Sequence, residues 1–553
     1  MSISKFFSLV TLVVFLSSCG LSTMSTKYEA VNINVTPSPL QVHAGKISLT
    51  LDANFPEKYF AKTATVDFTP VLIFDGGEKS FKTITVQGET ALGGEATIFY
   101  ANGGSFSYQD KVNYNPQMLN SVLELRAVAK SKEKELVFTP KKIAVGVLAT
   151  STRVQNSEII LNAGSDYEYE TILEETATIY FLVNQSNIRA TEKSTDEINN
   201  LEAFAKLGNV THSIEVKSFA SPEGSINLND NVSEKRAAST LRYAKRILKE
   251  AKINGASNNE LYTEKSEGED WEGFNSLMKS SEIKDKRRIT KIVNSVEDLE
   301  LREQAIRDMA EIYDAIEKNV LPQLRKAQIT VRSFQPKKTD AEISELAISN
   351  PQSLDLKEIL HAAELSNDEK SKISIYDNAS QIHKNWKGLN NIAAIYLNKG
   401  NLNQASQYLK KAEKLNNSSD EVKNNLGVLA AWQGKYTKAQ NYYSKTKNSS
   451  NNQAILDIRK GDYQKASRYF KNKKNHNAAL AKMLNGQNSI CNESTAECHY
   501  LNAISAARSG DTKEVLKNLS SAISMQEDYK KEAKMDLEFV NLKENIDFQN
   551  LLN

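Results

Sequence analysis

The spacing of hydrophobic positions changes along this chain and divides it into three regions. From about residue 28 to 151 it has a period of two, as in the run K-I-S-L-T-L at 46–51, which is typical of half-buried strands. Glycine pairs at 76–77, 93–94 and 103–104 predict turns. Further strands are predicted at Thr65–Phe74, Lys82–Gln87, Glu95–Tyr100 and Val122–Ala127. Short strands joined by glycine turns predict an all-β sandwich, with domain bounds of 19–151.

Residues 152–335 alternate between strand-like and helix-like runs. Strands are predicted at Ala177–Val183, Ile214–Phe219 and Ala327–Phe334, and helices at Thr195–Leu207 and Ser233–Lys249. Ser233 is the expected N-cap of the second helix, because a serine hydroxyl accepts from the free N–H groups there. The order β-α-β-α-β predicts an α+β domain. A charged helical insertion, about 251–322, precedes the last strand.

Residues 336–553 are helical and repetitive. Taking Trp386–Ser419 as one 34-residue unit, small and large apolar residues fall at regular packing positions: Leu389, Ile392, Ala393, Tyr396, Ala405, Leu409 and Ala412. Gly400 lies at the turn between its two helices. A second unit begins at Asp420, and weaker copies surround Gly461 and Gly510. The pattern resembles the tetratricopeptide repeat (TPR), which implies a helical solenoid with a concave surface. The segments at about 340–385 and 526–553 are its expected caps.

A motif in the middle region points to a family. Asn229, Val232, Ser233, Arg236 and Ala237 follow a predicted strand and the turn S-P-E-G at 221–224. They resemble the N-x-x-[LV]-S-x-x-R-A signature of the OmpA-like peptidoglycan-binding domain. The S-P-E-G turn and the E-D-W run at 269–271 resemble versions of that domain from Bacteroidota. The resemblance implies that residues 152–335 form an OmpA-like domain with an insertion.

The same resemblance implies a ligand site. In that family an aspartate after the second strand and an arginine on the following helix hold the diaminopimelate of the stem peptide. Here Arg236 and Asn229 match, Ser221 stands at the aspartate position, and Glu223 is the acid that could replace it. Without a negative group the ligand loses a charge-assisted bond of ~1.5–3 kcal/mol. In the alternative, Asn229, Ser233 and Arg236 only cap and pack the strand–helix junction.

The N-terminus resembles a bacterial lipoprotein signal. Lys5 precedes an apolar run, Phe6–Phe15, and then the sequence L-S-S-C-G at 16–20. The resemblance implies a signal peptide at 1–18, cleavage before Cys19 and lipidation of its thiol; the alternative is an ordinary signal peptide with an incidental cysteine. Surface-exported lipoproteins of Bacteroidota-type bacteria often carry an acidic cluster just after the cysteine, whereas here no acidic residue follows Cys19 until Glu29. The comparison with those lipoproteins therefore implies the periplasmic face of the outer membrane.

Charge and chemistry exclude several classes of function. A net charge of +2 over 553 residues gives no nucleic-acid footprint. Cys491 and Cys498 form a disulfide in an oxidising compartment, or remain two free thiols. The six histidines lack metal-ligand spacing. His499 lies beside Cys498 and Glu497, but these neighbours alone offer too few ligands to predict a metal site. The pair Glu269–Asp270 is more typical of a helix start than of a catalytic site. We expect no enzyme, no metal and no cofactor beyond the lipid on Cys19.

Two functions from different classes remain. The first is a periplasmic outer-membrane lipoprotein that tethers to peptidoglycan through Arg236, Asn229, Ser221 and Glu223 and scaffolds envelope proteins through its repeats. The second is a subunit of an outer-membrane protein insertion or secretion complex that does not bind peptidoglycan. An envelope enzyme would require a catalytic constellation that the sequence does not present.

Overall fold

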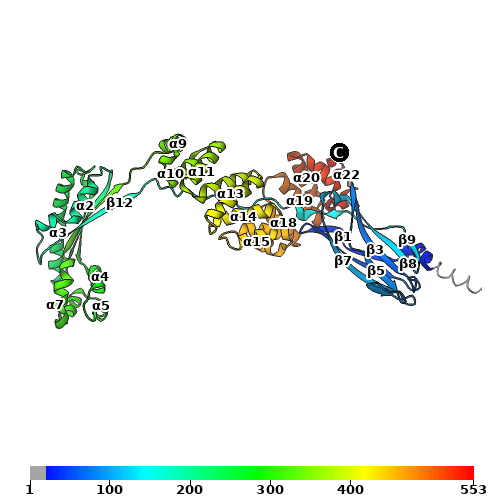
Figure 1. Ribbon diagram of the computed structural model, residues 1–553, viewed down its shortest axis with the longest axis horizontal. Helices are drawn as coiled ribbons and strands as arrows, with labels where there is room; N and C mark the ends of the chain where they lie inside the picture. The colour runs from blue at the N-terminus through cyan, green and yellow to red at the C-terminus, as the bar shows by residue number, and fades with distance from the viewer. Residues whose placement is uncertain (1–19) are drawn as a thin grey trace, which may run out of the picture. The chain divides into compact units, whose positions relative to one another are not determined.

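The computed structural model describes residues 20–553 (Figure 1). They divide into two compact units: the first joins residues 20–164 to residues 376–553, and the second is Ser165–Ile375. The predicted signal peptide and Cys19 lie outside the described residues, so the lipid anchor stays a prediction. Within residues 20–553, no helix is both long enough and apolar enough to cross a membrane. The division into three domains also stays a prediction.

The N-terminal part of the first unit contains two β-sheets, which confirms the predicted β-rich region. One sheet has the order β11-β1-β2-β7; the other has the order β10-β8-β3-β5-β6, with β4 beside β3 and β9 beside β8. The strands are β1 (Asn32–His43), β2 (Lys46–Phe55), β3 (Thr65–Phe74), β4 (Gly77–Ser80), β5 (Ile84–Gly88), β6 (Ala96–Ile98), β7 (Gly104–Asn113), β8 (Val122–Ser131), β9 (Lys134–Val137), β10 (Lys141–Val145) and β11 (Val147–Leu148). Three short 3-10 helices accompany them: η1 (Tyr28–Ala30), η2 (Pro116–Asn120) and η3 (Thr150–Arg153).

The two sheets share one hydrophobic core. The ring of Phe68 in β3 lies 5.9 Å from that of Phe55 in β2 and 5.7 Å from that of Phe106 in β7. Strand β3 coincides with its predicted range, but β1 was not predicted. Its sequence contains Pro37 and Pro39, which cannot donate ladder hydrogen bonds, and its pairing with β2 shifts register in that stretch.

The second unit contains a mixed four-stranded sheet of order β12-β15-β13-β14. Strands β13 and β14 are parallel, and β15 runs antiparallel to both of its neighbours. The elements in chain order are β12 (Ile172–Tyr180), η4 (Thr191–Lys193), α2 (Asp196–Ala205), β13 (Thr211–Ala220), α3 (Ile226–Glu250), η5 (Asn259–Leu261), β14 (Tyr262–Glu269) and β15 (Lys326–Phe334). Helices α2 and α3 pack on the sheet through a core that includes Ile198, Leu201 and Ile247.

Two sequence predictions in this unit were wrong in detail. The first strand ends at Tyr180, so Leu182 and Val183 lie beyond it and are exposed. Helix α3 begins at Ile226 after Ser225, so Ser233 is not its N-cap. The Ser233 hydroxyl instead donates to the carbonyl oxygen of Asp230, a local bond that lets serine sit inside a helix.

The insertion predicted as helical begins with a strand. Strand β14 pairs with β13 over a polar stretch, T-E-K-S-E-G-E, whose composition hides its role as an edge strand. Short helices follow and share a core of their own around Phe274 and Ile316. They are α4 (Trp271–Ser280), α5 (Lys286–Ser295), α6 (Leu299–Arg307), α7 (Ala310–Asn319) and α8 (Leu321–Leu324). Helices α9 (Asp340–Ser349) and α10 (Leu356–Leu365), with η6 (Pro351–Ser353) between them, complete this unit, and α11 (Glu369–His383) follows.

The C-terminal part of the first unit is a series of helical hairpins, as the repeat pattern predicted. The helices are α12 (Trp386–Asn398), α13 (Leu402–Leu415), α14 (Asp420–Trp432), α15 (Tyr436–Tyr443), α16 (Ser450–Lys460), α17 (Tyr463–Tyr469), α18 (His476–Leu484), α19 (Ala496–Ser509), α20 (Thr512–Met525), α21 (Asp528–Met535), η7 (Leu537–Leu542) and α22 (Ile546–Leu552). The predicted packing residues Ala405, Leu409 and Ala412 are fully buried. Gly427 is needed because a Cβ there would lie 2.4 Å from the Tyr443 ring.

The β-sheets and the last helices of this unit are in direct contact, although they lie hundreds of residues apart. Arg153 donates to Glu532 at 2.6 Å and to Asp536 at 3.0 Å, and its guanidinium lies 4.2 Å from the Tyr500 ring centroid. His43 of β1 is hydrogen-bonded to the Tyr463 hydroxyl at 2.9 Å. No local pattern predicted this docking, because each partner is satisfied by a residue far away in the chain.

Candidate functional site

Arg236 is a buried structural residue in this fold. Only 1% of it is exposed, and its guanidinium donates to the carbonyl oxygens of Leu182, Gln185 and Phe219 at 2.9–3.1 Å. Burial and the neighbouring Arg325 lower the pKa of Arg236 to about 10, so it stays protonated at neutral pH. The side chain therefore fastens the loop after β12 to α3 and β13.

Ser221 and Glu223 are joined to an arginine that the motif did not include. Arg325 binds the Glu223 carboxylate with both Nε and Nη2 at 2.8 Å, and the Ser221 hydroxyl donates to the same carboxylate at 2.8 Å. Such a two-pronged pair uses both carboxylate oxygens. The negative charge proposed to replace the missing aspartate is thus matched within the fold. Arg325 lies 102 residues from Glu223, so no local signal revealed it.

Asn229 lies beside a pair of glutamates. Its amide donates to Glu269 at 2.7 Å, to Glu303 at 3.4 Å and to the carbonyl of Gly224 at 3.2 Å, while Trp271 donates to the other Glu269 oxygen at 2.8 Å. Burial and the hydrogen bond to Glu269 raise the pKa of Glu303 to about 8, so Glu303 is mostly protonated at neutral pH. The structure brings the predicted ligand residues close together, but it engages each of them in bonds within the protein.

The acidic pair flagged in the sequence has a structural role. Asp270 caps α4 by accepting from the N–H of Gly273 at 2.7 Å, and it forms an ion pair with Lys326 at 2.8 Å. Its neighbour Glu269 accepts from Asn229 and Trp271, as above. The helix-start interpretation thus holds for Asp270, whereas Glu269 ends β14.

One face of the solenoid, here called the groove, is occupied by the chain itself. Residues 154–164, here called the strap, have no regular secondary structure and run along helices α12, α14, α16 and α18. One buried asparagine from each helix both accepts from an N–H and donates to a C=O of a single strap residue. The pairs are Asn391 with Ala163, Asn425 with Leu161, Asn452 with Ile159 and Asn477 with Gln155, at 2.6–2.9 Å.

The asparagines also connect neighbouring repeats. Asn425 donates to Asn390 at 3.0 Å, and Asn452 donates to Asn424 at 2.9 Å. A carboxamide offers one donor side and one acceptor side, so it matches a peptide group and is indifferent to the side chain attached. The ladder of asparagines therefore recognises an extended main chain and not a particular sequence.

One ion pair fixes which strap residue lies at which repeat. The Glu158 side chain is fully buried, accepts from the Trp432 indole N–H at 2.7 Å and pairs with Arg459 at 3.1 Å. A shift of the strap by two residues would keep the main-chain bonds possible but would bury this carboxylate without its partners. Glu158 thus sets the register of the strap.

The sequence analysis did not predict these asparagine contacts, although repeated asparagine doublets could have indicated them. The doublets Asn390–Asn391 and Asn424–Asn425 recur 34 residues apart, and Asn451–Asn452 follows. Asparagine is a weak helix former, so a repeated doublet inside a helix indicates a role for its amide. The domain boundary predicted at 152 places the strap in the middle domain and so separates it from the helices that it contacts.

In the second unit the chain after the strap contacts α10. The N–H and hydroxyl of Ser165 both donate to Glu364, at 2.9 and 2.7 Å, and the Tyr167 ring stacks on His361 with centroids 4.3 Å apart. Lys338 pairs with Glu358 of the same helix at 2.9 Å. Helix α10 thereby contacts both the segment that precedes β12 and the segment that follows β15.

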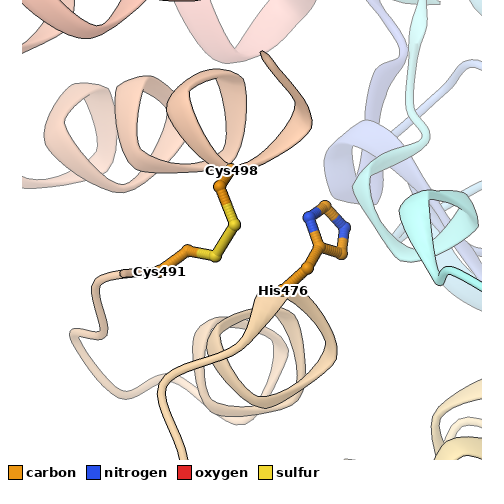
Figure 2. A group of neighbouring side chains, drawn as sticks. All are labelled: His476, Cys491 and Cys498. Atoms are coloured by element: carbon orange, nitrogen blue, oxygen red, sulfur yellow. A yellow bond between two sulfur atoms is a disulfide. The ribbon is translucent and has the colours of Figure 1, made fainter. Parts of the chain in front are cut away.

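Cys491 and Cys498 form a disulfide that closes the loop between α18 and α19. The imidazole next to it is that of His476, the first residue of α18 (Figure 2). His499, which adjoins Cys498 in sequence, is not part of this group. The ligand atoms of His476 and the two cysteines lie within 4.8 Å of one another. Burial lowers the pKa of His476, so its ring is neutral at pH 7.

Comparison with known proteins finds similarity to tetratricopeptide repeat proteins of known structure. No protein-family model and no curated protein matches the chain. Among solved structures it is similar to a TPR protein from Parabacteroides merdae (16% identity, TM-score 0.29, covering 42% of this chain and 99% of that one). It is also similar to YrrB, a TPR protein with an unusual peptide-binding site (15%, 0.23, 37% and 100%), and to yeast Tom70 (15%, 0.19, 58% and 77%). With scores this low, the repeat assignment rests on the hairpins themselves.

Proposed function

We propose that this protein is a non-enzymatic scaffold of the bacterial cell envelope, anchored to the periplasmic face of the outer membrane by a lipid on Cys19. The observation that carries the scaffold proposal is the strap in the solenoid groove. TPR-like hairpins form protein-binding surfaces, and here the groove is occupied from Gln155 to Ala163 by the chain's own backbone. The groove is then an internal clamp, and partner proteins bind elsewhere on the solenoid.

A pocket on the last repeats, lined mostly by polar residues, is the surface we propose for a protein partner. It has a volume of about 770 Å³ and lies among α18, α19 and α20, with Lys474 and Lys482 in its lining. Ile490 also lines it and is 65% exposed, the kind of apolar side chain that a partner covers. The partner we expect is a subunit of an outer-membrane protein insertion or secretion complex.

Site-specific photo-crosslinking in cells tests the scaffold. A photoreactive amino acid at position 490, at Leu415 or at Met525 should give a discrete protein adduct, because these exposed side chains lie on the solenoid. The control is position 92 in the β-sheet region, where Leu92 is 90% exposed. If position 490 gives no protein adduct, the pocket is not the partner site, and if none of the three solenoid positions does, the scaffold proposal fails.

Peptidoglycan tethering is the second candidate, favoured by the position of Asn229 and Arg236 on α3. Two contacts argue against it: Arg236 donates to backbone carbonyls, and Glu223 is paired with Arg325. Co-sedimentation of residues 20–553 with purified sacculi decides between the two. We expect the protein to stay in the supernatant. Pelleting by the wild type that is lost in Glu223→Gln, with the fold retained, would restore the tether.

A further inference from the structure

Three side chains with metal-binding chemistry meet beside the loop that joins α18 to α19. Cys491, Cys498 and His476 are 3%, 0% and 3% exposed, and their ligand atoms lie within 4.8 Å of one another. Two sulfurs and an imidazole nitrogen form a donor set that suits soft and borderline cations such as Zn²⁺.

The orientation of His476 is that of a metal ligand. Its Nε2 lies 2.8 Å from the carbonyl oxygen of Arg153, a contact that requires Nε2 to carry the proton and donate. The lone pair is then on Nδ1, which has no hydrogen-bond partner within residues 20–553. Figure 2 shows the ring turned toward the two sulfurs. A buried nitrogen without a partner is costly, whereas a ligating histidine commonly donates its other N–H to a backbone carbonyl.

A carboxylate lies at the same place. Oε2 of Glu493 is 3.4 Å from the Cys498 sulfur and 3.7 Å from the Cys491 sulfur. It also accepts from the backbone N–H of His476 at 2.9 Å, which holds it beside the imidazole. A disulfide has no proton to donate to this oxygen, but thiols have. The position of Glu493 is thus compatible with two free thiols as well as with the disulfide.

The loop is held independently of the disulfide. The side chain of Asn502 accepts from the N–H of Cys491 at 2.8 Å and donates to its C=O at 2.9 Å. Cys498 is fixed on the first turn of α19, where its N–H donates to the Thr495 hydroxyl at 3.2 Å. Both cysteines therefore stay in place when the bond between them opens.

We propose that the cluster has a second state, in which reduction of the disulfide creates a Zn²⁺ site with Cys491, Cys498 and His476 as ligands and Glu493 as the fourth. A phosphine reductant takes up the oxygen of one water molecule, and the S–S bond gains two electrons and two protons to give two thiols. Zn²⁺ then displaces both thiol protons to solvent and binds two thiolates and Nδ1. The disulfide and the metal exclude each other.

Metal titration of residues 20–553 before and after reduction tests this proposal. Reduced protein should bind one Zn²⁺ per chain in competition with a chromophoric chelator, and Co²⁺ should give sulfur-to-metal charge-transfer and tetrahedral d–d absorption. Oxidised protein should give neither. His476→Ala should weaken binding by at least ~10-fold, as loss of even an outer-shell partner does.

His499→Ala is the matched control, since His499 adjoins Cys498 in sequence and lies outside the cluster. It should bind Zn²⁺ like the wild type. Glu493→Gln keeps the shape of the fourth side chain and should bind more weakly, with an altered Co²⁺ spectrum. The proposal is overturned if reduced protein binds no more metal than oxidised protein, or if His476→Ala and His499→Ala have the same affinity.

Discussion

The carboxamide of Asn425 in α14 accepts from the N–H of Leu161 at 2.9 Å and donates to its C=O at 2.7 Å, although 264 residues separate the two. The same relationship recurs on three neighbouring helices. It converts a solenoid groove, which in isolation would be a binding surface, into an internal clamp. A solenoid of this kind can strengthen a scaffold without being free to bind a peptide in its groove.

Loss of one rung of the ladder should loosen the strap. Asn425→Ala leaves the buried N–H of Leu161 without its acceptor, which costs about 1–3 kcal/mol. We expect a lower unfolding midpoint in urea and faster hydrogen exchange at residues 159–163. The exposed Asn403→Ala in α13 is the matched control and should change neither. Equal exchange in the two variants would show that the strap is held by other contacts.

Glu158→Ala should be more harmful than the loss of one asparagine. Removing this fully buried carboxylate leaves Arg459 without its ion-pair partner, and breaking a buried pair costs about 3–5 kcal/mol. Glu158→Gln keeps an acceptor for the Trp432 indole and should lose less. Trp432 fluorescence during urea unfolding in a Trp271→Phe, Trp386→Phe background measures both. If Glu158→Ala is as stable as the wild type, Glu158 does not set the register.

Arg236→Ala should destabilise the second unit. Three backbone carbonyls lose the hydrogen bond from Arg236, a penalty of about 1–3 kcal/mol or more. Thermal unfolding is the measurement, with the exposed Arg242→Ala on the same helix as a control that should stay within about 0.5 kcal/mol of the wild type. An unchanged melting temperature for Arg236→Ala would contradict its structural role.

Stability of the second unit should fall as the pH rises from about 4.5 to about 8. The folded state raises the pKa of Glu303 from 4.5 to about 8, chiefly by burial, so over this range the folded state holds a proton that the unfolded chain releases. The free energy of unfolding then decreases by up to ~1.4 kcal/mol per pH unit and levels off above the folded pKa.

Glu303→Gln, which mimics the protonated acid, should remove most of this slope. Trp271 reports on the second unit, since the other two tryptophans, Trp386 and Trp432, lie in the first. Urea unfolding at pH 5, 7 and 9 in a Trp386→Phe, Trp432→Phe background is therefore the measurement. A wild-type protein that becomes more stable over this pH range would contradict the proposed proton on Glu303.

Local pattern was sufficient for the parts of the fold that repeat or alternate. The TPR-like hairpins from Trp386 onward, strand β3 and strand β15 were predicted because burial on one face imposes a period of 3.6 or 2 on the sequence. The motif at 229–237 likewise brought Ser221, Glu223, Asn229 and Arg236 to one region. The motif could not predict the bonding partners of these residues, because Arg325 and Glu303 lie 102 and 74 residues away from Glu223 and Asn229.

The sequence by itself thus determined which faces are buried, where the helices turn, and which residue types are available for chemistry. Only the tertiary structure decided that the strap fills the groove, that polar β14 is a strand, and that His476 and not His499 meets the cysteine pair. The physical reason is the same in each case. A main-chain group, an edge strand or a buried imidazole is satisfied by a partner distant in the chain, and periodicity records burial without naming that partner.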